Sequence, residues 1–296
     1  MATALIVGVG GLGCPAALSL VESAVVDRLV LVDPDEVSLS NLHRQLLYTL
    51  ADVGRPKVEV AQERLWARRS DVEIVTHVGR FTVENADQLL VGVDVIIDAT
   101  DEPAARFDIN DRALAHGIPA VLGGILGFQG LVLAVAGTHG PCFRCLFEEP
   151  PGPEEAATCG QAGVLGAFAG FIGHLQAERA LGLLRGETAT HTGFVTTVDG
   201  IAGRIREVPL PEATDCPACG GVAARLDITP YQCPMTYVRT RLAMEQLSPG
   251  GLLDVVMRQG EPARNIPRSL DEEGHEVLSL GACGEEHYRV VVRRGA

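Results

Sequence analysis

The chain has 296 residues, 47% of them hydrophobic, which is enough for one large α/β domain and a second, small one. Its formal net charge of −14 argues against a nucleic-acid partner, because neutralising phosphates requires clustered lysine and arginine. No basic residue precedes Arg28, so we expect no secretory signal and a cytoplasmic protein.

The first predicted elements are a strand, a glycine-rich turn, a helix and a second strand. Residues 4–7 and 29–32 are apolar runs of strand type, and the segment between them contains the spacing G-x-G-x-x-G. These glycines are Gly8, Gly10 and Gly13. Glycine allows a sharp turn, close approach to a phosphate and tight helix packing, and the helix N-terminus attracts an anion. Asp33 ends the second strand, where a carboxylate accepts hydrogen bonds from ribose, so the unit predicts a nucleotide site.

The segment from residue 33 to residue 45 narrows this prediction. A nicotinamide-dependent oxidoreductase would share the glycine fingerprint and Asp33, but its chain would then enter the next helix. The present segment instead carries many polar side chains, among them Asp35, Asn41, Arg44 and Gln45. It strongly resembles the signature of the MoeB/ThiF/HesA enzymes, relatives of the ubiquitin-activating enzyme that adenylate the C-terminus of small ubiquitin-fold proteins.

The resemblance implies a site for ATP and Mg²⁺. The residues implied to bind the nucleotide are Gly8, Gly10, Gly11, Gly13, Asp33, Asp35, Asn41, Arg44, Gln45, Lys57 and Asp101. Of these, Arg44 and Lys57 would neutralise phosphate charge, and Asp101 would place Mg²⁺.

Lys57 opens the next predicted helix, since Pro56 suits a first-turn position and apolar residues follow at helical spacing. A lysine there is disfavoured by the helix dipole, and its ordinary role is that of a solvated surface residue. The resemblance implies instead that Lys57 contacts the ATP phosphates, and we prefer this interpretation.

Two more strands are predicted over residues 73–78 and 92–98, and Asp101 follows the second of them. The carboxyl ends of strands in open α/β sheets face the ligand crevice, so Asp101 is expected there. It could also cap the following helix, which Pro103 would enter well. By resemblance, Arg106 and Asn110 on that helix match further family positions.

Two long uncharged stretches require comparison with a membrane span. Glycines divide residues 113–143, so we predict two buried strands joined at residues 127–130 rather than a spanning helix. Residues 158–177 contain Gln161, His174 and Gln176, and we predict a glycine-rich core helix from about Gly163. Neither stretch predicts a membrane protein.

The chain has eight cysteines, and four of them form two Cys-x-x-Cys pairs: Cys142 with Cys145, and Cys216 with Cys219. Two such pairs, both with turn-forming neighbours, can complete a tetrahedral thiolate site for Zn²⁺. All four coordination positions are then filled, which predicts a structural metal. A redox Cys-x-x-Cys is the alternative, and it does not explain why there are two.

A proline-rich acidic loop, residues 148–155, precedes Cys159. A thiol on a loop just before a helix can have a lowered pKa. In the resembled family, the matching cysteine can form a covalent bond with the activated carrier, so we favour a nucleophile over an inert thiol. Cys14 and Cys283 are predicted to be small buried or half-exposed thiols.

The C-terminal part predicts a separate domain with the order strand, helix, strand, helix, strand, strand. The predicted strands are residues 223–228, 252–257, 276–280 and 288–292, and the second helix is residues 263–273. This order resembles the TusA/SirA sulfur-relay domain, whose signature is Cys-Pro-x-Pro at the start of the first helix. Cys233 and Pro234 match it, whereas Thr236 replaces the second proline.

Cys233 is expected to carry a persulfide, because the start of a helix favours a thiolate. The alternative is a degenerate domain that serves only for docking.

The prediction is therefore a Rossmann-like, mostly parallel α/β domain with a structural zinc site over residues 1–222, and a small α+β two-layer sandwich over residues 223–296. The candidate catalytic residues are Arg44, Lys57, Asp101, Cys159 and Cys233. The predicted function is ATP-dependent adenylation of the C-terminal glycine of a small ubiquitin-fold sulfur carrier that ends in diglycine, followed by sulfur transfer to give a thiocarboxylate.

The implied partners are that carrier and a persulfide donor such as a cysteine desulfurase or a rhodanese. A homodimer is also implied, although the chain begins at the first strand and lacks the Arg- and Gln-rich segment that relatives insert into the partner subunit's site. Two alternatives stay open: adenylation of a peptide or other acid without sulfur transfer, and a non-catalytic sulfur-relay scaffold.

Overall fold

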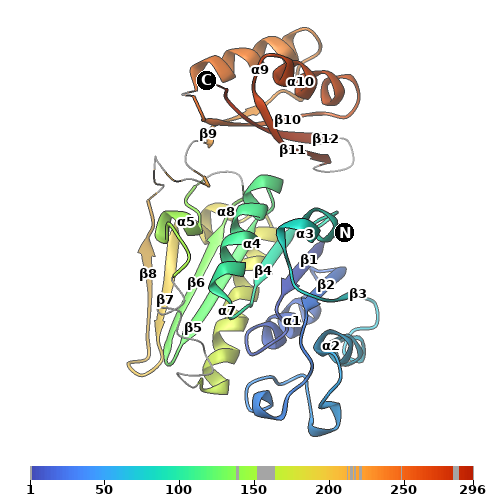
Figure 1. Cartoon of the computed structure of the whole chain (residues 1–296), viewed down its shortest axis with the longest axis vertical. Coiled ribbons are helices and arrows are strands. Elements are labelled where there is room, and N and C mark those ends of the chain that lie inside the picture. The colour runs from blue at the N-terminus through green and yellow to red at the C-terminus, as the bar shows by residue number, and fades with distance from the viewer. Residues whose placement is uncertain are drawn as a thin grey trace.

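The computed structural model describes residues 2–137, 140–151, 164–211, 213, 216, 218–219, 222–247, 249–282 and 287–295. These residues form an eight-stranded sheet with helices on both faces and a separate four-stranded sheet with two helices (Figure 1). The predicted fold class, a Rossmann-like domain followed by a small two-layer sandwich, is confirmed.

The first sheet has the strand order β3-β2-β1-β4-β5-β6-β7-β8. Its first five strands run parallel, and the last three are antiparallel to their neighbours. The strands are β1 Thr3–Val7, β2 Arg28–Asp33, β3 Glu73–Val78, β4 Val95–Asp98, β5 Ala120–Leu126, β6 Gln129–Val135, β7 Phe194–Asp199 and β8 Arg204–Pro209. Strand β1 is buried along its whole length, as expected of a central parallel strand covered on both faces.

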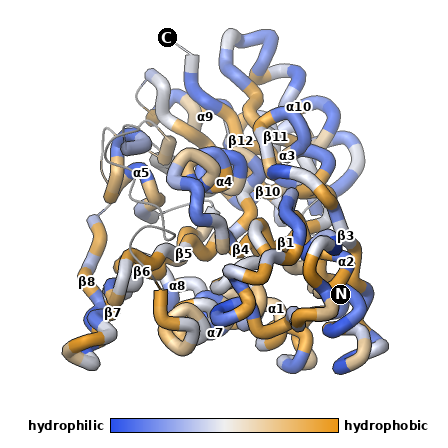
Figure 2. Tube along the Cα trace, turned by 60° about the horizontal axis from the view of Figure 1, so that its bottom comes forward, coloured by the Kyte–Doolittle hydropathy of each residue, from blue (hydrophilic) through white to orange (hydrophobic). Residues whose placement is uncertain are grey.

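Each face of this sheet has its own core, because successive side chains of a strand point to opposite faces. Ala4 and Ile6 pack in one core with α1 Gly13–Glu22, α2 Lys57–Trp66 and α7 Gly166–Leu184. Leu5 and Val7 pack in the other, with α3 Val83–Leu89 and α4 Pro103–His116. Figure 2 shows hydrophobic residues along β1 and α1, which is the pattern of elements buried between layers.

The shorter elements of the first domain connect these layers. They are the 3-10 turns η1 Leu39–Asn41 and η2 Leu50–Asp52 and the helices α5 Phe143–Leu146 and α8 Thr188–His191.

The uncharged stretch over residues 113–143 forms strands β5 and β6, joined at Gly127, so the prediction of two buried strands is confirmed. Helix α7 begins at Gly166, and residue 163 lies outside the described residues. Within the described residues, no helix combines the length and apolar character that crossing a membrane requires.

The second sheet has the order β11-β12-β10-β9. Its elements are β9 Val222–Asp227, α9 Met235–Gln246, β10 Leu252–Arg258, α10 Glu261–Glu272, β11 Glu276–Ala282 and β12 His287–Arg293, in the predicted order. Leu253, Val255 and Met257 of β10 pack in a core with residues of both helices. The helices therefore cover one face of this sheet. The domain boundary between residues 222 and 223 stays a prediction.

The uncovered face of the second sheet lies toward the first domain (Figure 1). Asp254 and Arg289 lie on this face and line a cavity of about 490 Å³ between the domains. Arg289 Nη1 donates a 2.7 Å hydrogen bond to the carbonyl oxygen of Gly117, just before β5. Since β5 runs parallel to β4, Gly117 marks the edge where the parallel strands begin. The C-terminal domain thus docks at the amino-end edge of the first sheet.

Candidate active site

A cavity of about 260 Å³ opens at the opposite edge, where the parallel strands end. Ten of the eleven residues predicted to bind the nucleotide line it: Gly8, Gly10, Gly11, Asp33, Asp35, Asn41, Arg44, Gln45, Lys57 and Asp101. They come from loops far apart in the sequence, which the parallel sheet brings to one edge.

The glycine turn forms the floor of this cavity. Gly8 has a φ of +89°, and a Cβ on it would lie 2.7 Å from the carbonyl oxygen of Ala99, so only glycine fits without strain. Gly13 lies outside the lining, and a Cβ there would lie 2.0 Å from the carbonyl oxygen of Gly8. Gly13 therefore lets α1 pack closely on the turn.

Asp33 fixes the turn as well as facing the cavity. Its Oδ2 accepts a 2.6 Å hydrogen bond from Val9 N, and its Oδ1 accepts one of 2.8 Å from Asp35 N. Burial raises the pKa of Asp33, and the nearby Lys57 ammonium opposes that shift. The carboxylate therefore needs a cation beside it to stay ionised in this buried position.

Lys57 supplies that cation. Its side chain is 5% exposed, and its Nζ lies 2.7 Å from Asp35 Oδ2 and 3.8 Å from Asp33 Oδ1. The alternative of a solvated surface lysine is therefore wrong. Lys57 is also the single lysine of the chain, among 24 lysine and arginine residues.

Three arginines complete the cationic side of the cavity: Arg44, Arg80 and Arg106. Arg80 pairs with Glu102, and Arg106 Nε donates a 2.6 Å hydrogen bond to the fully buried Asp98. Arg44 has no carboxylate partner within the described residues; Arg44 Nη1 lies 3.3 Å from His43 Nε2. Arg44 is thus the cation most available to an anionic ligand.

Asp101 is the carboxylate of the cavity that is most available to a ligand. Asp101 is exposed and makes no ion pair or hydrogen bond in the described parts of the chain. Glu102 occupies the N-cap position of helix α4, without a side-chain cap hydrogen bond, so Asp101 does not take the helix-capping role considered from the sequence. Gln45 Oε1 is buried and has no hydrogen-bond partner among the described residues, so this acceptor is free to bind a ligand.

Arg80 also lines the cavity and is not among the residues predicted from the sequence, although its position carries a usable signal. It follows strand β3 by two residues, and β3 runs parallel to β2. Residues just beyond the carboxyl end of a parallel strand reach the same crevice. Asn110, which was matched to the family, lies elsewhere: its Oδ1 accepts a 2.9 Å hydrogen bond from Phe143 N.

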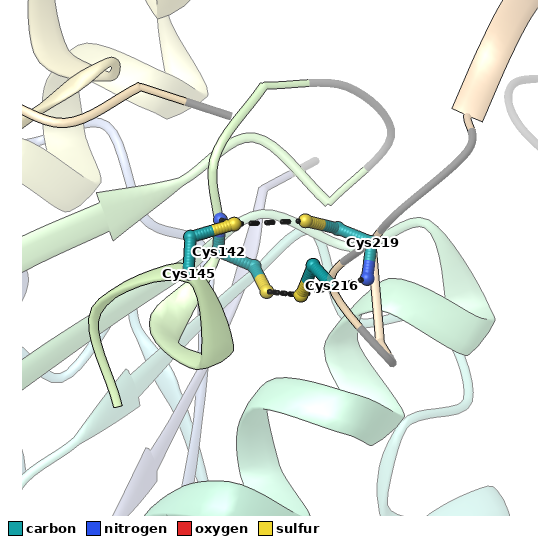
Figure 3. Close-up of side chains that lie close together, drawn as sticks. All are labelled: Cys142, Cys145, Cys216 and Cys219. Carbon is teal, nitrogen blue, oxygen red and sulfur yellow. Dashed lines mark hydrogen bonds between the residues drawn. The ribbon is translucent and has the colours of Figure 1, made fainter. Parts of the chain in front are cut away.

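The side chains of the two Cys-x-x-Cys pairs point toward one another (Figure 3). The four sulfur atoms lie within 4.8 Å of one another, with Cys142 and Cys216 Sγ 3.6 Å apart and Cys145 and Cys219 Sγ 3.2 Å apart. Four thiolates at bonds of about 2.3 Å to one tetrahedral ion would lie at similar separations. Hydrogen bonds from the Cys219 and Cys216 thiols lower the pKa of Cys142 to about 6.

Each pair has the local geometry of a metal knuckle. Cys142 N lies 3.5 Å from Cys145 Sγ, and Cys219 N lies 3.5 Å from Cys216 Sγ, so a backbone N–H donates to a sulfur in both turns. Such bonds favour the thiolate form that a metal requires. The cluster is closed, with three of its four cysteines buried, which fits a structural rather than a catalytic metal.

Profiles of known families match almost the whole chain. The ThiF family profile matches residues 1–218. The chain belongs to the ThiF family. The profile of sulfurtransferase TusA matches residues 224–294, so this ThiF family member carries a TusA domain after its Rossmann-like domain.

Several curated relatives match most of this chain. The chain is 38% identical over 269 residues to adenylyltransferase and sulfurtransferase MOCS3 of Aedes aegypti, covering 90% of this chain and 61% of that protein. It is 38% identical to the sulfur carrier protein adenylyltransferase of Thermus thermophilus (78% and 87% covered) and 41% identical to the sulfur carrier protein ThiS adenylyltransferase of Escherichia coli (73% and 85%). The chain thus spans about three fifths of MOCS3.

Solved structures share the fold of this ThiF family member. The crystal structure of E. coli MccB with ATP has a TM-score of 0.65 at 17% identity, covering 74% of this chain and 67% of that one. The structure of PaaA has a TM-score of 0.61 at 22% identity, covering 72% and 65%.

The remaining cysteines differ in accessibility. Cys14 is fully buried under the glycine turn, and burial raises its pKa to about 12, as suits a packing thiol. Cys233 is exposed and precedes α9 by two residues. Cys159 and Cys283 lie outside the described residues.

Proposed function

We propose that this ThiF family member uses ATP to adenylate the C-terminal glycine of a small ubiquitin-fold sulfur carrier, and that its TusA domain then supplies sulfur to give a thiocarboxylate. The observation that carries the proposal is the convergence of Arg44, Lys57 and Asp101 on one cavity over a glycine turn. The names of two relatives that match over more than four fifths of their length, both sulfur carrier adenylyltransferases, support it.

The first step requires charge stabilisation more than covalent chemistry. An oxygen of the carrier's C-terminal carboxylate attacks the α-phosphorus of ATP, and the bond to pyrophosphate breaks. Arg44 and Lys57 would neutralise the phosphates, and the glycine turn would let backbone N–H groups approach them. Asp33 would accept hydrogen bonds from the ribose. Asp101, without a partner among the described residues, would bind Mg²⁺, which neutralises further phosphate charge when present.

In the second step a sulfur nucleophile displaces AMP from the acyl adenylate. We assign this nucleophile to a persulfide on Cys233, whose terminal sulfur forms the new bond to the acyl carbon. A further thiol then attacks Cys233 Sγ, becomes disulfide-bonded to it and frees the thiocarboxylate. Cys159, outside the described residues, is the second candidate for an acyl intermediate. A cysteine desulfurase or rhodanese would load Cys233.

The docked C-terminal domain constrains this step. Its contacts with the first domain lie at the amino-end edge, and no described residue from 222 to 295 lines the nucleotide cavity. Only residues 220–221 separate Cys219 from strand β9. Sulfur delivery therefore requires either that the TusA domain leaves its docked position or that Cys233 serves the cavity of a second chain, which a homodimer would place nearby.

We assign Zn²⁺ to the four-cysteine cluster, where it would tie the segment before β9 to the first domain. Stable free thiols and thiolate-bound zinc suit the reducing cytoplasm, which we propose as the location.

Intact-mass spectrometry of carriers that end in diglycine tests the proposal. The enzyme, Mg-ATP and a persulfide source should give a carrier whose mass reports replacement of one oxygen by sulfur, and Cys233→Ser should abolish it. Adenylation that persists without any sulfur product would favour the alternative of a plain adenylating enzyme. Absence of ATP–pyrophosphate exchange with every carrier would favour the non-catalytic scaffold.

A further inference from the structure

The surroundings of Cys233 contain a polar group that the proposed sulfur step has not used, the hydroxyl of Thr236. Thr236 is the second residue of α9 and is 1% exposed. Its Oγ1 lies 3.5 Å from Cys233 Sγ, within hydrogen-bonding range for sulfur. Cys233 itself is exposed. A buried hydroxyl thus lies within hydrogen-bonding distance of a solvent-accessible sulfur.

The rotamer of Thr236 restricts the position of this hydroxyl. Thr240, fully buried one turn later, hydrogen-bonds the backbone of Thr236: its hydroxyl donates to the carbonyl oxygen at 2.8 Å. The β-branched side chain of Thr236 has few rotamers in a helix, so its Oγ1 has little freedom. Among the described residues, Cys233 Sγ is the hydrogen-bond partner of the Thr236 hydroxyl.

We propose that Thr236 is a positioning residue that donates its hydroxyl hydrogen to the Cys233 thiolate; this rests on the proposed sulfur-relay function. Between a neutral thiol and a hydroxyl, either group can donate. A thiolate has no hydrogen, so the hydroxyl must donate to it, and such a bond favours the anion. The free N–H groups at the start of α9 act in the same direction.

The thiolate form of Cys233 is the nucleophile of the loading step. Cys233 Sγ attacks the terminal sulfur of the donor's persulfide; the new S–S bond forms, the donor's S–S bond breaks, and the donor cysteine leaves as a thiolate. Until the new bond forms, the charge on Sγ lies next to the Thr236 hydroxyl. In the proposed release, the attacking thiol instead forms a disulfide with Sγ and the charge leaves on the thiocarboxylate. Threonine at the place of the motif's second proline therefore adds a donor that proline lacks.

The test uses the full-length protein and its variants Thr236→Val, Thr236→Ala and Thr236→Ser. Alkylation of Cys233 by iodoacetamide is followed between pH 6 and pH 9, with peptide mass spectrometry to separate Cys233 from the other cysteines. The two variants without a hydroxyl should react about threefold to tenfold more slowly at pH 7, with the midpoint of the rate profile displaced upward by about half to one pH unit. Thr236→Ser should stay within about twofold of the parent.

Thr240→Val is the matched control, because it removes a buried hydroxyl from the same helix face without touching Cys233; its profile should follow the parent. The proposal is overturned if Thr236→Val and Thr236→Ala keep the parent profile, or if Thr236→Ser behaves like them. The alkylation readout needs neither ATP nor a carrier. A displaced profile in a protein that produces no thiocarboxylate would therefore reject the proposed function and leave the role of Thr236 standing.

Discussion

Arg289 in strand β12 donates a 2.7 Å hydrogen bond to the carbonyl oxygen of Gly117, the residue that ends helix α4 of the other domain. The same guanidinium bonds both oxygens of the buried Asp254, at 2.7 and 2.9 Å. One side chain therefore joins the open face of the second sheet to the end of a helix, where a cation is favoured by the helix dipole. This link holds the TusA domain at the edge opposite the cavity that Arg44, Lys57 and Asp101 line.

Replacing Arg289 with methionine should loosen this docking, because the carbonyl of Gly117 loses its donor while the apolar stem is kept. A lost hydrogen bond to a charged group corresponds to about 1.5–3 kcal/mol. We expect amide hydrogen exchange around residues 114–118 to become at least about tenfold faster. Arg268→Met, at an exposed position of α10, is the matched control and should leave that exchange unchanged. Equal exchange in both variants would show that Arg289 does not hold the domains together.

Mixing two inactive variants should restore thiocarboxylate formation. Arg44→Ala removes the cavity cation that has no carboxylate partner among the described residues, and Cys233→Ser removes the proposed sulfur nucleophile. The TusA domain is docked at the edge opposite the cavity of its own chain, and only residues 220–221 separate it from Cys219. We therefore expect Cys233 of one chain to react at the cavity of another chain. Product should then rise with the concentration of the mixture, as mass spectrometry of the carrier would measure. A mixture as inactive as its components would show that sulfur moves within one chain after undocking.

Removing one thiol of the four-cysteine cluster should release the metal and destabilise the protein. We expect Cys216→Ser to lose zinc and to unfold with a free energy lower by several kcal/mol, since structural zinc contributes directly to folding. Zinc analysis and thermal unfolding with and without a chelator measure both effects. Cys233→Ser removes an exposed thiol outside the cluster and should retain about one zinc per chain. Full zinc content in Cys216→Ser would refute the site.

Lys57→Met should reduce ATP–pyrophosphate exchange by about 100-fold, because a phosphate-neutralising charge is lost from a shielded site.

Lys57→Met should also change how the free energy of unfolding depends on pH. Burial already raises the pKa of Asp33, and removing the ammonium that opposes this shift raises it further. The folded variant then binds a proton more readily than the unfolded chain, so its unfolding free energy relative to the parent should fall as pH rises from 4 to 7. If the unfolding free energies of Lys57→Met and the parent differ by the same amount at pH 4 and at pH 7, the coupling between Lys57 and Asp33 is contradicted.

The single lysine also permits a direct chemical test of its location. An acyl-phosphate derivative of ATP that acylates nearby lysines should label Lys57, the one lysine in the sequence, and excess Mg-ATP should prevent the labelling. Labelling that ATP does not reduce would place the nucleotide elsewhere.

The sequence predicted the cavity well because its residues follow strands whose apolar runs are unambiguous. Parallel strands such as β1 and β4 align their carboxyl ends, so Gly8 and Asp101, which follow these strands, line the same cavity. The same rule could have found Arg80. The pairing of Lys57 with Asp35 could not be predicted from the sequence, because it depends on the path of an irregular loop.

The domain docking could not be predicted for a different reason. The face of β10 and β12 that carries Asp254 and Arg289 mixes charged and apolar residues, so its sequence does not distinguish contact with water from contact with another domain. In the fold this sheet face contacts the other domain. Arg289 hydrogen-bonds Asp254 and the carbonyl oxygen of Gly117 at the end of α4. Strand β8 was not predicted, because its exposed residues form no buried apolar run.

The most direct test of the central claim is carrier-dependent ATP–pyrophosphate exchange, measured for the parent protein and for Arg44→Ala, together with calorimetric titration by Mg-ATP and by NAD. The account predicts exchange that requires a carrier ending in diglycine, a loss of about 100-fold or more in Arg44→Ala, and binding of Mg-ATP but not of NAD. Tight binding of NAD with none of Mg-ATP, or exchange that survives in Arg44→Ala, would contradict it.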